Sequence, residues 1–312
     1  MLHLRLIVPA DRTDEVLQLL EETVGTAHLV VLSGAARDPR GDVVMCDVAR
    51  EAGDGLLARL RETGLDRTGS IALEHIDLSL SRRADRAADE APGEGADAVL
   101  WESLTDATHE ESTLSATYLA FLTLATMIAA CGVVLDNAIL IVGAMAVGPE
   151  FGPLAGISTA LVRRAPRLAW RSLVALIGGF ALAMVVTCGF SYFMDAVGLF
   201  TEQQAGGPRP NTSFIWQPDW MSFVVAFLAG VAGTLSLTSA KSGALVGVAI
   251  SVTTVPAAAN AAVAFAYGDY PQTWGSSTQL VLNLAGIVIA GTLTLVTQKL
   301  LWARHGAHPV AR

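Results

Sequence analysis

The stretch NAILIVGAMAVGPEFGPLAGISTALVRR, residues 137–164, is apolar enough, and longer than the ~20 residues needed, to cross a bilayer. Pro149 and Pro153 lie near its middle, where each removes a backbone donor and disrupts the preceding helical turn. The stretch is therefore a predicted membrane span that is broken at its centre. Small residues recur every four positions and form a face on which another backbone can approach closely: Ala144, Gly148, Gly152, Gly156 and Ala160.

Glu150 lies between the two prolines and is the one acidic residue deep inside any predicted span. An ionisable group at this depth is costly and usually functional. Two states make it tolerable, a protonated carboxyl group or a carboxylate with a bound cation. We expect Glu150 to couple protons or bind a cation. The alternative is a structural role, in which a protonated Glu150 donates a hydrogen bond to a carbonyl oxygen that the prolines leave free.

A second broken span is predicted at 243–267, GALVGVAISVTTVPAAANAAVAFAY, with Pro256 at its centre. Spans one to three and spans four to six then each have a proline-broken middle helix. Because each set has an odd number of spans, the second set must lie upside down in the membrane relative to the first. The pattern predicts an inverted repeat, an architecture that recurs in transporters. The alternative is two ordinary proline-kinked helices packed together. The six predicted spans are 114–134, 138–162, 168–194, 221–240, 243–267 and 278–301.

We expect certain residues to line a transport path or to couple an ion. Most of them lie around these two breaks, and one further amide lies in the sixth span. They are Glu150, Pro149, Pro153, Gly148, Gly152, Thr253, Thr254, Pro256, Asn260 and Asn283.

Composition divides the chain into two parts. Hydrophobic residues make up 52% of the 312 residues and charged residues 16%, against about 25% charged in an average soluble protein. Residues 1–112 hold 11 Arg and 23 Asp and Glu, whereas residues 113–312 hold 9 basic and 6 acidic residues. A disordered chain, a secreted disulfide scaffold and a nucleic-acid binder are thereby excluded. We expect a head at 1–80, a charged linker with a short amphipathic helix at 81–112, a six-helix membrane domain at 113–303 and a tail at 304–312.

The head is predicted to be an α+β domain. Strands are expected at 2–8, 27–33, 43–48 and 71–80, with one helix after the first strand and another at 52–63. The order β-α-β-β-α-β is that of the ferredoxin-like fold, which serves in regulatory modules and in dimerisation. His28, His75 and Cys46 lack metal-ligand spacing, so no metal or cofactor is expected.

Charge also predicts the orientation of the membrane domain. The N-terminus lacks the pattern of a signal peptide, and the positive-inside rule places both termini in the cytoplasm, with the spans in the inner membrane. The basic residues on the cytoplasmic side are Arg163, Arg164, Arg167, Arg171, Lys241, Lys299, Arg304 and Arg312, and the outer connections hold only Arg209.

The segments GAMAVGPEFGP (143–153), AGVAGTLSL (229–237) and ALVGVAISVTTVP (244–256) resemble the bacterial and archaeal family called domain of unknown function 389. The resemblance extends over about 100–300 and includes VLWESLTDATHEEST (99–113) and LVLNLAGI (280–287). It implies a multi-pass membrane protein, often with a soluble N-terminal region. The general family pattern has an apolar residue at the position of Glu150.

These observations predict a transporter or channel for a small solute or ion, regulated or assembled into a homo-oligomer by its head. The alternative is a membrane-anchored sensor or scaffold whose head binds a ligand or partner. An enzyme is not expected, because no histidine lies within a predicted span to support nucleophilic or metal chemistry there. The six histidines are His3, His28, His75, His109, His305 and His308.

Overall fold

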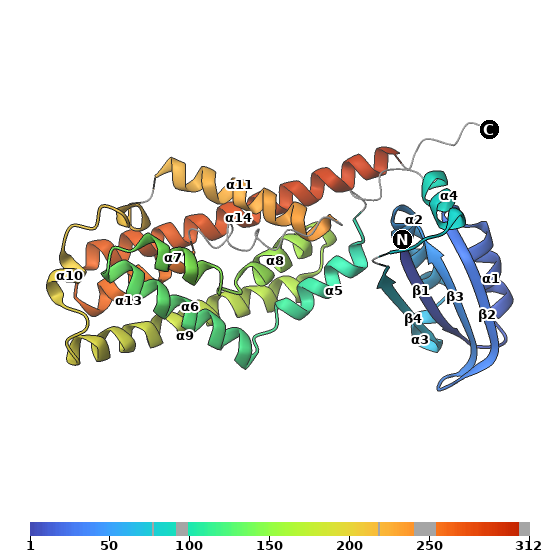
Figure 1. Ribbon diagram of the computed structural model, residues 1–312, viewed down its shortest axis with the longest axis horizontal. Coiled ribbons are helices and arrows are strands. Elements are labelled where there is room, and N and C mark those ends of the chain that lie inside the picture. Colours follow the sequence, from blue (N-terminus) through green and yellow to red (C-terminus); the bar gives the residue numbers. More distant parts are fainter. Residues whose placement is uncertain (77, 92–98, 218, 240–253, 306–312) are drawn as a thin grey trace. The chain divides into compact units, whose positions relative to one another are not determined.

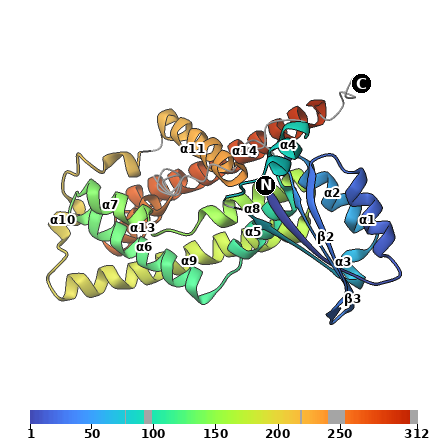
Figure 2. The same ribbon diagram turned by 45° about the vertical axis from the view of Figure 1, so that its right-hand side comes forward.

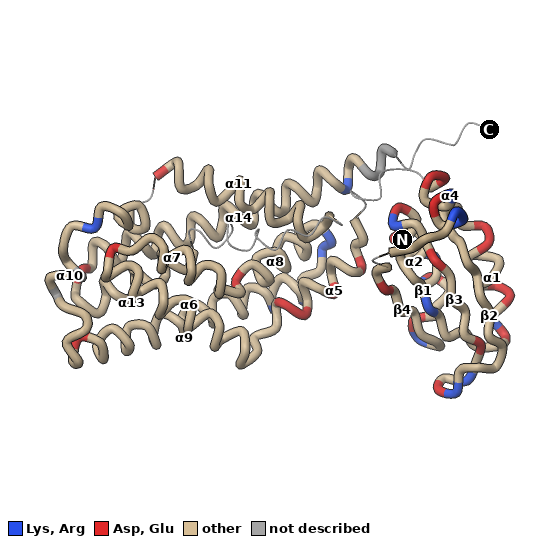
Figure 3. The backbone as a smooth tube through the Cα atoms, in the orientation of Figure 1, with Lys and Arg blue, Asp and Glu red and all other residues tan. Residues whose placement is uncertain are grey.

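The computed structural model describes residues 1–76, 78–91, 99–217, 219–239 and 254–305, and the chain divides into two compact units (Figure 1). The head comprises Met1–Ser103 with two short later segments, Thr238–Lys241 and Leu300–Arg312. The body comprises Leu104–Leu237 and Ser242–Lys299. Figure 3 shows charged residues spread over the head, while the helices of the body are almost free of charge. The two units thus differ in their content of charged residues.

The head is built on a four-stranded antiparallel sheet with the order β2-β3-β1-β4. Its strands are β1 (Leu2–Val8), β2 (Thr26–Arg37), β3 (Arg40–Val48) and β4 (Ser70–His75), and its helices include α1 (Thr13–Glu22), α2 (Arg50–Glu62) and α3 (Leu65–Thr68). Figure 2 shows α1 and α2 lying against one face of the sheet. The elements follow the predicted order with α3 added, and the last strand ends at His75 rather than continuing to 80.

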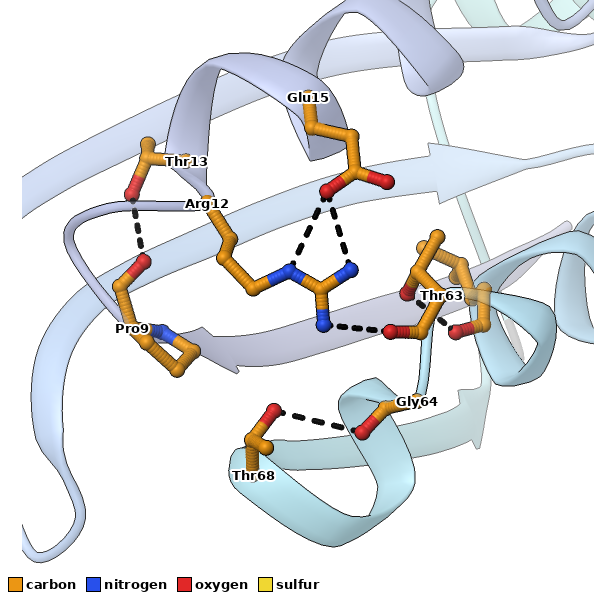
Figure 4. A network of polar contacts seen from close by, with 8 residues as sticks. Pro9, Arg12, Thr13, Glu15, Thr63, Gly64 and Thr68 are labelled. Carbon is orange, nitrogen blue, oxygen red and sulfur yellow. Dashed lines mark hydrogen bonds and ion pairs between the residues drawn. The ribbon is translucent and has the colours of Figure 1, made fainter.

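Alternation along β1 explains the core of the head. Leu2, Leu4, Leu6 and Val8 are at most 1% exposed, while the residues between them face away. Burying a side chain of this size contributes about 1.5–3 kcal/mol. At one end of the core, Arg12 ties α1 to α2, because it donates hydrogen bonds to the Glu15 carboxylate and to the Thr63 carbonyl oxygen (Figure 4).

The segment predicted as a flexible charged linker begins instead with a helix, α4 (Arg82–Glu90). The Ser81 hydroxyl caps this helix by accepting hydrogen bonds from the backbone N–H groups of Arg83 and Ala84. Ala84 and Ala87 form a buried face, and α4 packs against β2 and β3. Low overall hydrophobicity predicted a flexible segment. The helix forms because it has an N-terminal cap and because its two buried alanines pack against the sheet. Residues 92–98 lie outside the described part.

A hydrogen-bonded network joins the sheet of the head to this cap. The Asp47 carboxylate bonds Nδ1 of His3 at 2.8 Å and Nδ1 of His28 at 2.7 Å, and Nε2 of His28 bonds the Ser81 hydroxyl at 2.8 Å. Burial opposes ionisation of Asp47, yet its bonds to the two histidines outweigh burial, so the pKa of Asp47 is below its ordinary value. The network therefore depends on a charged Asp47.

Cys46 provides a probe of this network. Its side chain is 1% exposed, and burial, reinforced by the neighbouring Asp47 charge, raises the pKa of its thiol to about 12. At pH 7 we expect Cys46 to react with a maleimide only when the head opens. Hydrogen bonds to a charged group contribute about 1.5–3 kcal/mol each, so Asp47→Asn should accelerate the modification about tenfold or more. Peptide mass spectrometry of the full-length protein measures the rate at Cys46 alone.

The control for this prediction is Asp85→Asn, the same chemical change at an exposed position of α4. It should leave the rate of Cys46 modification at the wild-type value. Equal rates for Asp47→Asn and the wild type would show that the two histidine bonds do not hold the head closed.

Within the described residues, the body has four helices that are long and apolar enough to cross a membrane. They are α6 (Ala116–Val134), α9 (Pro166–Ala196), α11 (Trp220–Thr238) and α14 (Tyr270–His305), and they coincide with four of the predicted spans. The predicted second span consists of two short helices, α7 (Ala138–Met145) and α8 (Phe151–Arg163). Of the predicted fifth span, 243–253 lies outside the described residues, and the remainder forms α13 (Val255–Ala266).

Shorter elements flank these helices. The predicted amphipathic segment before the first span is α5 (Trp101–Glu111). The long connection between α9 and α11 contains α10 (Glu202–Gly206) and η1 (Ser213–Ile215).

Candidate functional site

Prolines define where the short helices of the body begin. Pro149 lies in the non-helical segment between α7 and α8, Pro153 is the third residue of α8, and Pro256 is the second residue of α13. The first N–H groups of a helix have no partner within it, so proline costs nothing there. Pro153 and Pro256 therefore each lie in the first turn of a described helix, α8 and α13.

Helices α8 and α13 meet at a buried hydrogen bond. Glu150 is the residue immediately before α8, and Thr254 is the residue immediately before α13. The Thr254 hydroxyl donates to Oε1 of Glu150 at 2.7 Å. Both residues are almost completely buried, with Glu150 1% exposed and Thr254 0% exposed. The structure thus brings together two of the predicted site residues that are 104 positions apart.

The backbone around this bond favours negative charge. The N-terminus of an α-helix carries a partial positive charge of about half a unit, from its free N–H groups and aligned peptide dipoles. Here Glu150 immediately precedes α8, and its carboxyl group bonds the hydroxyl of Thr254, which immediately precedes α13. Burial in apolar surroundings acts in the opposite direction and favours the neutral acid. Glu150 lies where these two effects oppose each other.

Close packing holds α8 and α13 in place. A β-carbon on Gly156 would lie 2.4 Å from the hydroxyl oxygens of both Ser112 and Ser172, so any larger residue requires these serines or the helix to shift. The Ser172 hydroxyl donates to that of Ser112 at 2.9 Å, and Ser158 of α8 donates to the Val288 carbonyl oxygen of α14 at 3.3 Å. α13 packs against α6, α7 and α9. The predicted small-residue face of α8 is used for close approach.

A second polar cluster lies around the far end of α13. The Asn260 side chain accepts a hydrogen bond from Arg209 at 3.0 Å and donates one to Ser276 of α14 at 2.7 Å. Arg209 also donates to Gln272, although this arginine is only 8% exposed. On α14, Gln279 donates to Asn283 at 3.2 Å. Two predicted site residues thus form polar contacts on these helices, Asn260 with Arg209 and Ser276, and Asn283 with Gln279.

The remaining predicted residues fall into place around the break. Gly148 and Pro149 lie in the non-helical segment 146–150, and Gly152 lies in the first turn of α8, whereas Thr253 lies outside the described residues. The sequence-based reasoning did not select Arg209, Gln272, Ser276 or Gln279. The sequence did contain a signal for the three residues on α14, because polar residues recur there at helical spacing on one face. They are Gln272, Ser276, Gln279 and Asn283.

Comparisons with known proteins agree with the resemblance noted in the sequence. Residues 145–289 match the model of the family described as Domain of unknown function (DUF389). An uncharacterised protein of Methanocaldococcus jannaschii is 23% identical over 189 residues, which cover 61% of this chain and 56% of that relative. No solved structure matches the chain. The matched region contains the break, Glu150, Thr254 and the second polar cluster, so this part of the membrane protein is similar to the DUF389 family.

Proposed function

We propose that this protein is a transporter or channel for a small solute or ion and that Glu150 couples the movement to protons or to a cation. The observation that carries the proposal is the buried bond between Glu150 and Thr254 at the meeting point of α8 and α13. A carboxyl group placed between two helix N-termini inside an apolar body has little structural purpose, since an apolar residue would pack there without a desolvation cost.

The proposed architecture has six crossings arranged as an inverted repeat, with both termini in the cytoplasm. Its support is the paired design of α8 and α13, each of which begins with a proline in its first turn just after a residue of the buried bond. Arg163, Arg164, Arg167 and Arg171, around the start of α9, favour a cytoplasmic position for that connection.

We assign the head a ferredoxin-like fold and a regulatory or assembly role in a homo-oligomer. The sheet order β2-β3-β1-β4 and the antiparallel pairing of all neighbours support the fold. Support for self-association comes from β2, an edge strand that leaves Leu29, Val30, Val31 and Leu32 between 36% and 47% exposed. An exposed apolar edge strand favours pairing with another chain.

The test is ion flux by purified wild-type protein in proteoliposomes. A potassium gradient with valinomycin sets the membrane potential, and a trapped dye follows the internal pH. We expect acidification faster than in protein-free liposomes, either with protons alone or on addition of a sodium gradient. Rates equal to those of protein-free liposomes under both conditions, with monodisperse protein, would overturn the proposed coupling.

A further inference from the structure

A pocket of about 420 Å³ opens beside the break between α7 and α8, where the end of α5 and the start of α6 approach it. This volume is within the range of small-molecule sites, about 300–1,000 Å³. Its walls combine two kinds of side chain, carboxylates and aromatic rings. The residues that matter for the argument are Glu110, Glu111, Tyr118, Phe121, Phe151 and Gly152.

The acidic wall carries charge that the neighbouring protein does not neutralise. In the described part of the chain, neither Glu110 nor Glu111 forms an ion pair. Arg171, the basic residue that donates a hydrogen bond to the pocket residue Thr113, does not pair with either carboxylate. Partial burial, and then the charge of Glu110, raise the pKa of Glu111 above its ordinary value. A cation in the pocket would relieve both effects.

Gly152 allows the Glu111 carboxylate to reach the break. A β-carbon at Gly152 would lie 2.5 Å from Cβ of Glu111 and 2.9 Å from its Oε2. Any larger residue would displace the glutamate from the pocket wall. The glycine predicted to line the path therefore permits the close approach of an acid that the sequence-based reasoning did not select.

Tyr118 contributes an aromatic ring to the pocket wall. It is 6% exposed and lines the pocket. Its hydroxyl is closed to solvent and lies beside Gly179 of α9, a helix that does not line the pocket, so the ring is the part of Tyr118 that a ligand can contact. Tyr118 is also close enough to Glu150 to feel its charge. The pocket thus adjoins the proposed coupling residue.

We propose that this pocket binds a small organic ammonium ion. The carboxylates of Glu110 and Glu111 supply the opposite charge, and the rings of Tyr118, Phe121 and Phe151 supply the π-faces that attract alkylammonium groups. A metal ion fits poorly, because the described residues contain no group of three His, Cys, Asp or Glu side chains arranged to hold one. This inference names a substrate class for the proposed transporter. Binding of the ammonium ion can be tested by itself, and only its transport rests on the proposed function.

The test is calorimetric binding of choline to the full-length protein in detergent, compared with its neutral isostere 3,3-dimethylbutan-1-ol. The two probes have similar shapes and differ in charge. We expect choline to bind at least about tenfold more tightly, a difference of about 1.4 kcal/mol. Glu111→Gln, Phe151→Leu and Tyr118→Leu should each weaken choline binding. The matched control is Asp106→Asn, an exposed acid on α5 outside the pocket, which should leave it unchanged.

Two sources could supply the ammonium group, a free amine or a lipid headgroup. Competition by dihexanoyl phosphatidylethanolamine, but not by dihexanoyl phosphatidylglycerol, would assign the pocket to a headgroup. Choline binding that neither lipid displaces would assign it to a free amine.

The results that would overturn the proposal are equal binding of choline and the alcohol, absence of choline binding, or equal losses in Glu111→Gln and Asp106→Asn. These outcomes are independent of ion flux. Proton flux without choline binding would refute the pocket and leave the proposed coupling intact. Choline binding without any flux would support the pocket and count against transport.

Discussion

Glu150→Gln is expected to reduce coupled ion flux in proteoliposomes to the level of protein-free liposomes. Glutamine has almost the same size and still offers an oxygen to the Thr254 hydroxyl, which donates to Glu150 at 2.7 Å. It can neither release a proton nor carry negative charge. The substitution therefore removes the proposed coupling chemistry while retaining the bond that joins α8 to α13. Internal pH under an imposed potential measures the effect.

Controls separate coupling from folding. Glu74→Gln makes the same change at an exposed residue of β4 and should leave flux unchanged. The melting temperature of Glu150→Gln should remain close to that of the wild type, or rise, because a neutral amide costs less to bury than a carboxylate. Wild-type flux in Glu150→Gln would show that Glu150 is a structural acid, the alternative that its sequence context leaves open.

Gly156→Val should destabilise the body more than any other change proposed here. The first added carbon would lie 2.4 Å from the hydroxyl oxygens of Ser112 and Ser172, which are 0% exposed and bonded to each other. Accommodating valine requires that bond to break or α8 to move away from α9. Overpacking of this kind costs about 1–3 kcal/mol or more, which corresponds to a fall in melting temperature of roughly 5–10 °C.

The matched control for this prediction is Gly143→Val on α7. A β-carbon at Gly143 meets no atom within 4 Å, so the same substitution has open space there. Its melting temperature in detergent should equal that of the wild type. A similar fall in both variants would indicate a general intolerance of valine in these helices rather than a close contact at Gly156.

Much of the membrane architecture was predictable because a bilayer imposes simple rules. Apolar length located four crossing helices, and the prolines located the break between α7 and α8. The depth of Glu150 singled it out before any contact was visible. These features can be found in the sequence because span length and helix breaks depend on residues that are near one another along the chain.

The partners of these residues were not predictable, because they come from tertiary packing. Thr253 and Thr254 are adjacent in the sequence, and nothing local indicates that Thr254 bonds Glu150. Asn260 was selected for its position in the fifth span. Its bonds to Arg209 and Ser276 arise only because the connection between α9 and α11, and helix α14, lie beside it in the folded chain. Tyr118 and Glu111 gave no sequence signal, since their importance arises only where α5 and α6 approach the break. Helix α4 was likewise not predictable, because it is stabilised by packing of its two buried alanines against the sheet.

The division of the proposed second crossing into α7 and α8 has a consequence for how the protein meets membranes of different thickness. Helix α9 has 31 residues and a length of roughly 46 Å, well above the ~30 Å hydrocarbon core, so it adapts to a thicker bilayer by tilting less. The 8 residues of α7 and 13 residues of α8 together span roughly 32 Å, little more than that core. We therefore expect thickening of the bilayer to strain the segment between them, where Glu150 lies. We expect lipid chain length to act on the proposed coupling residue itself.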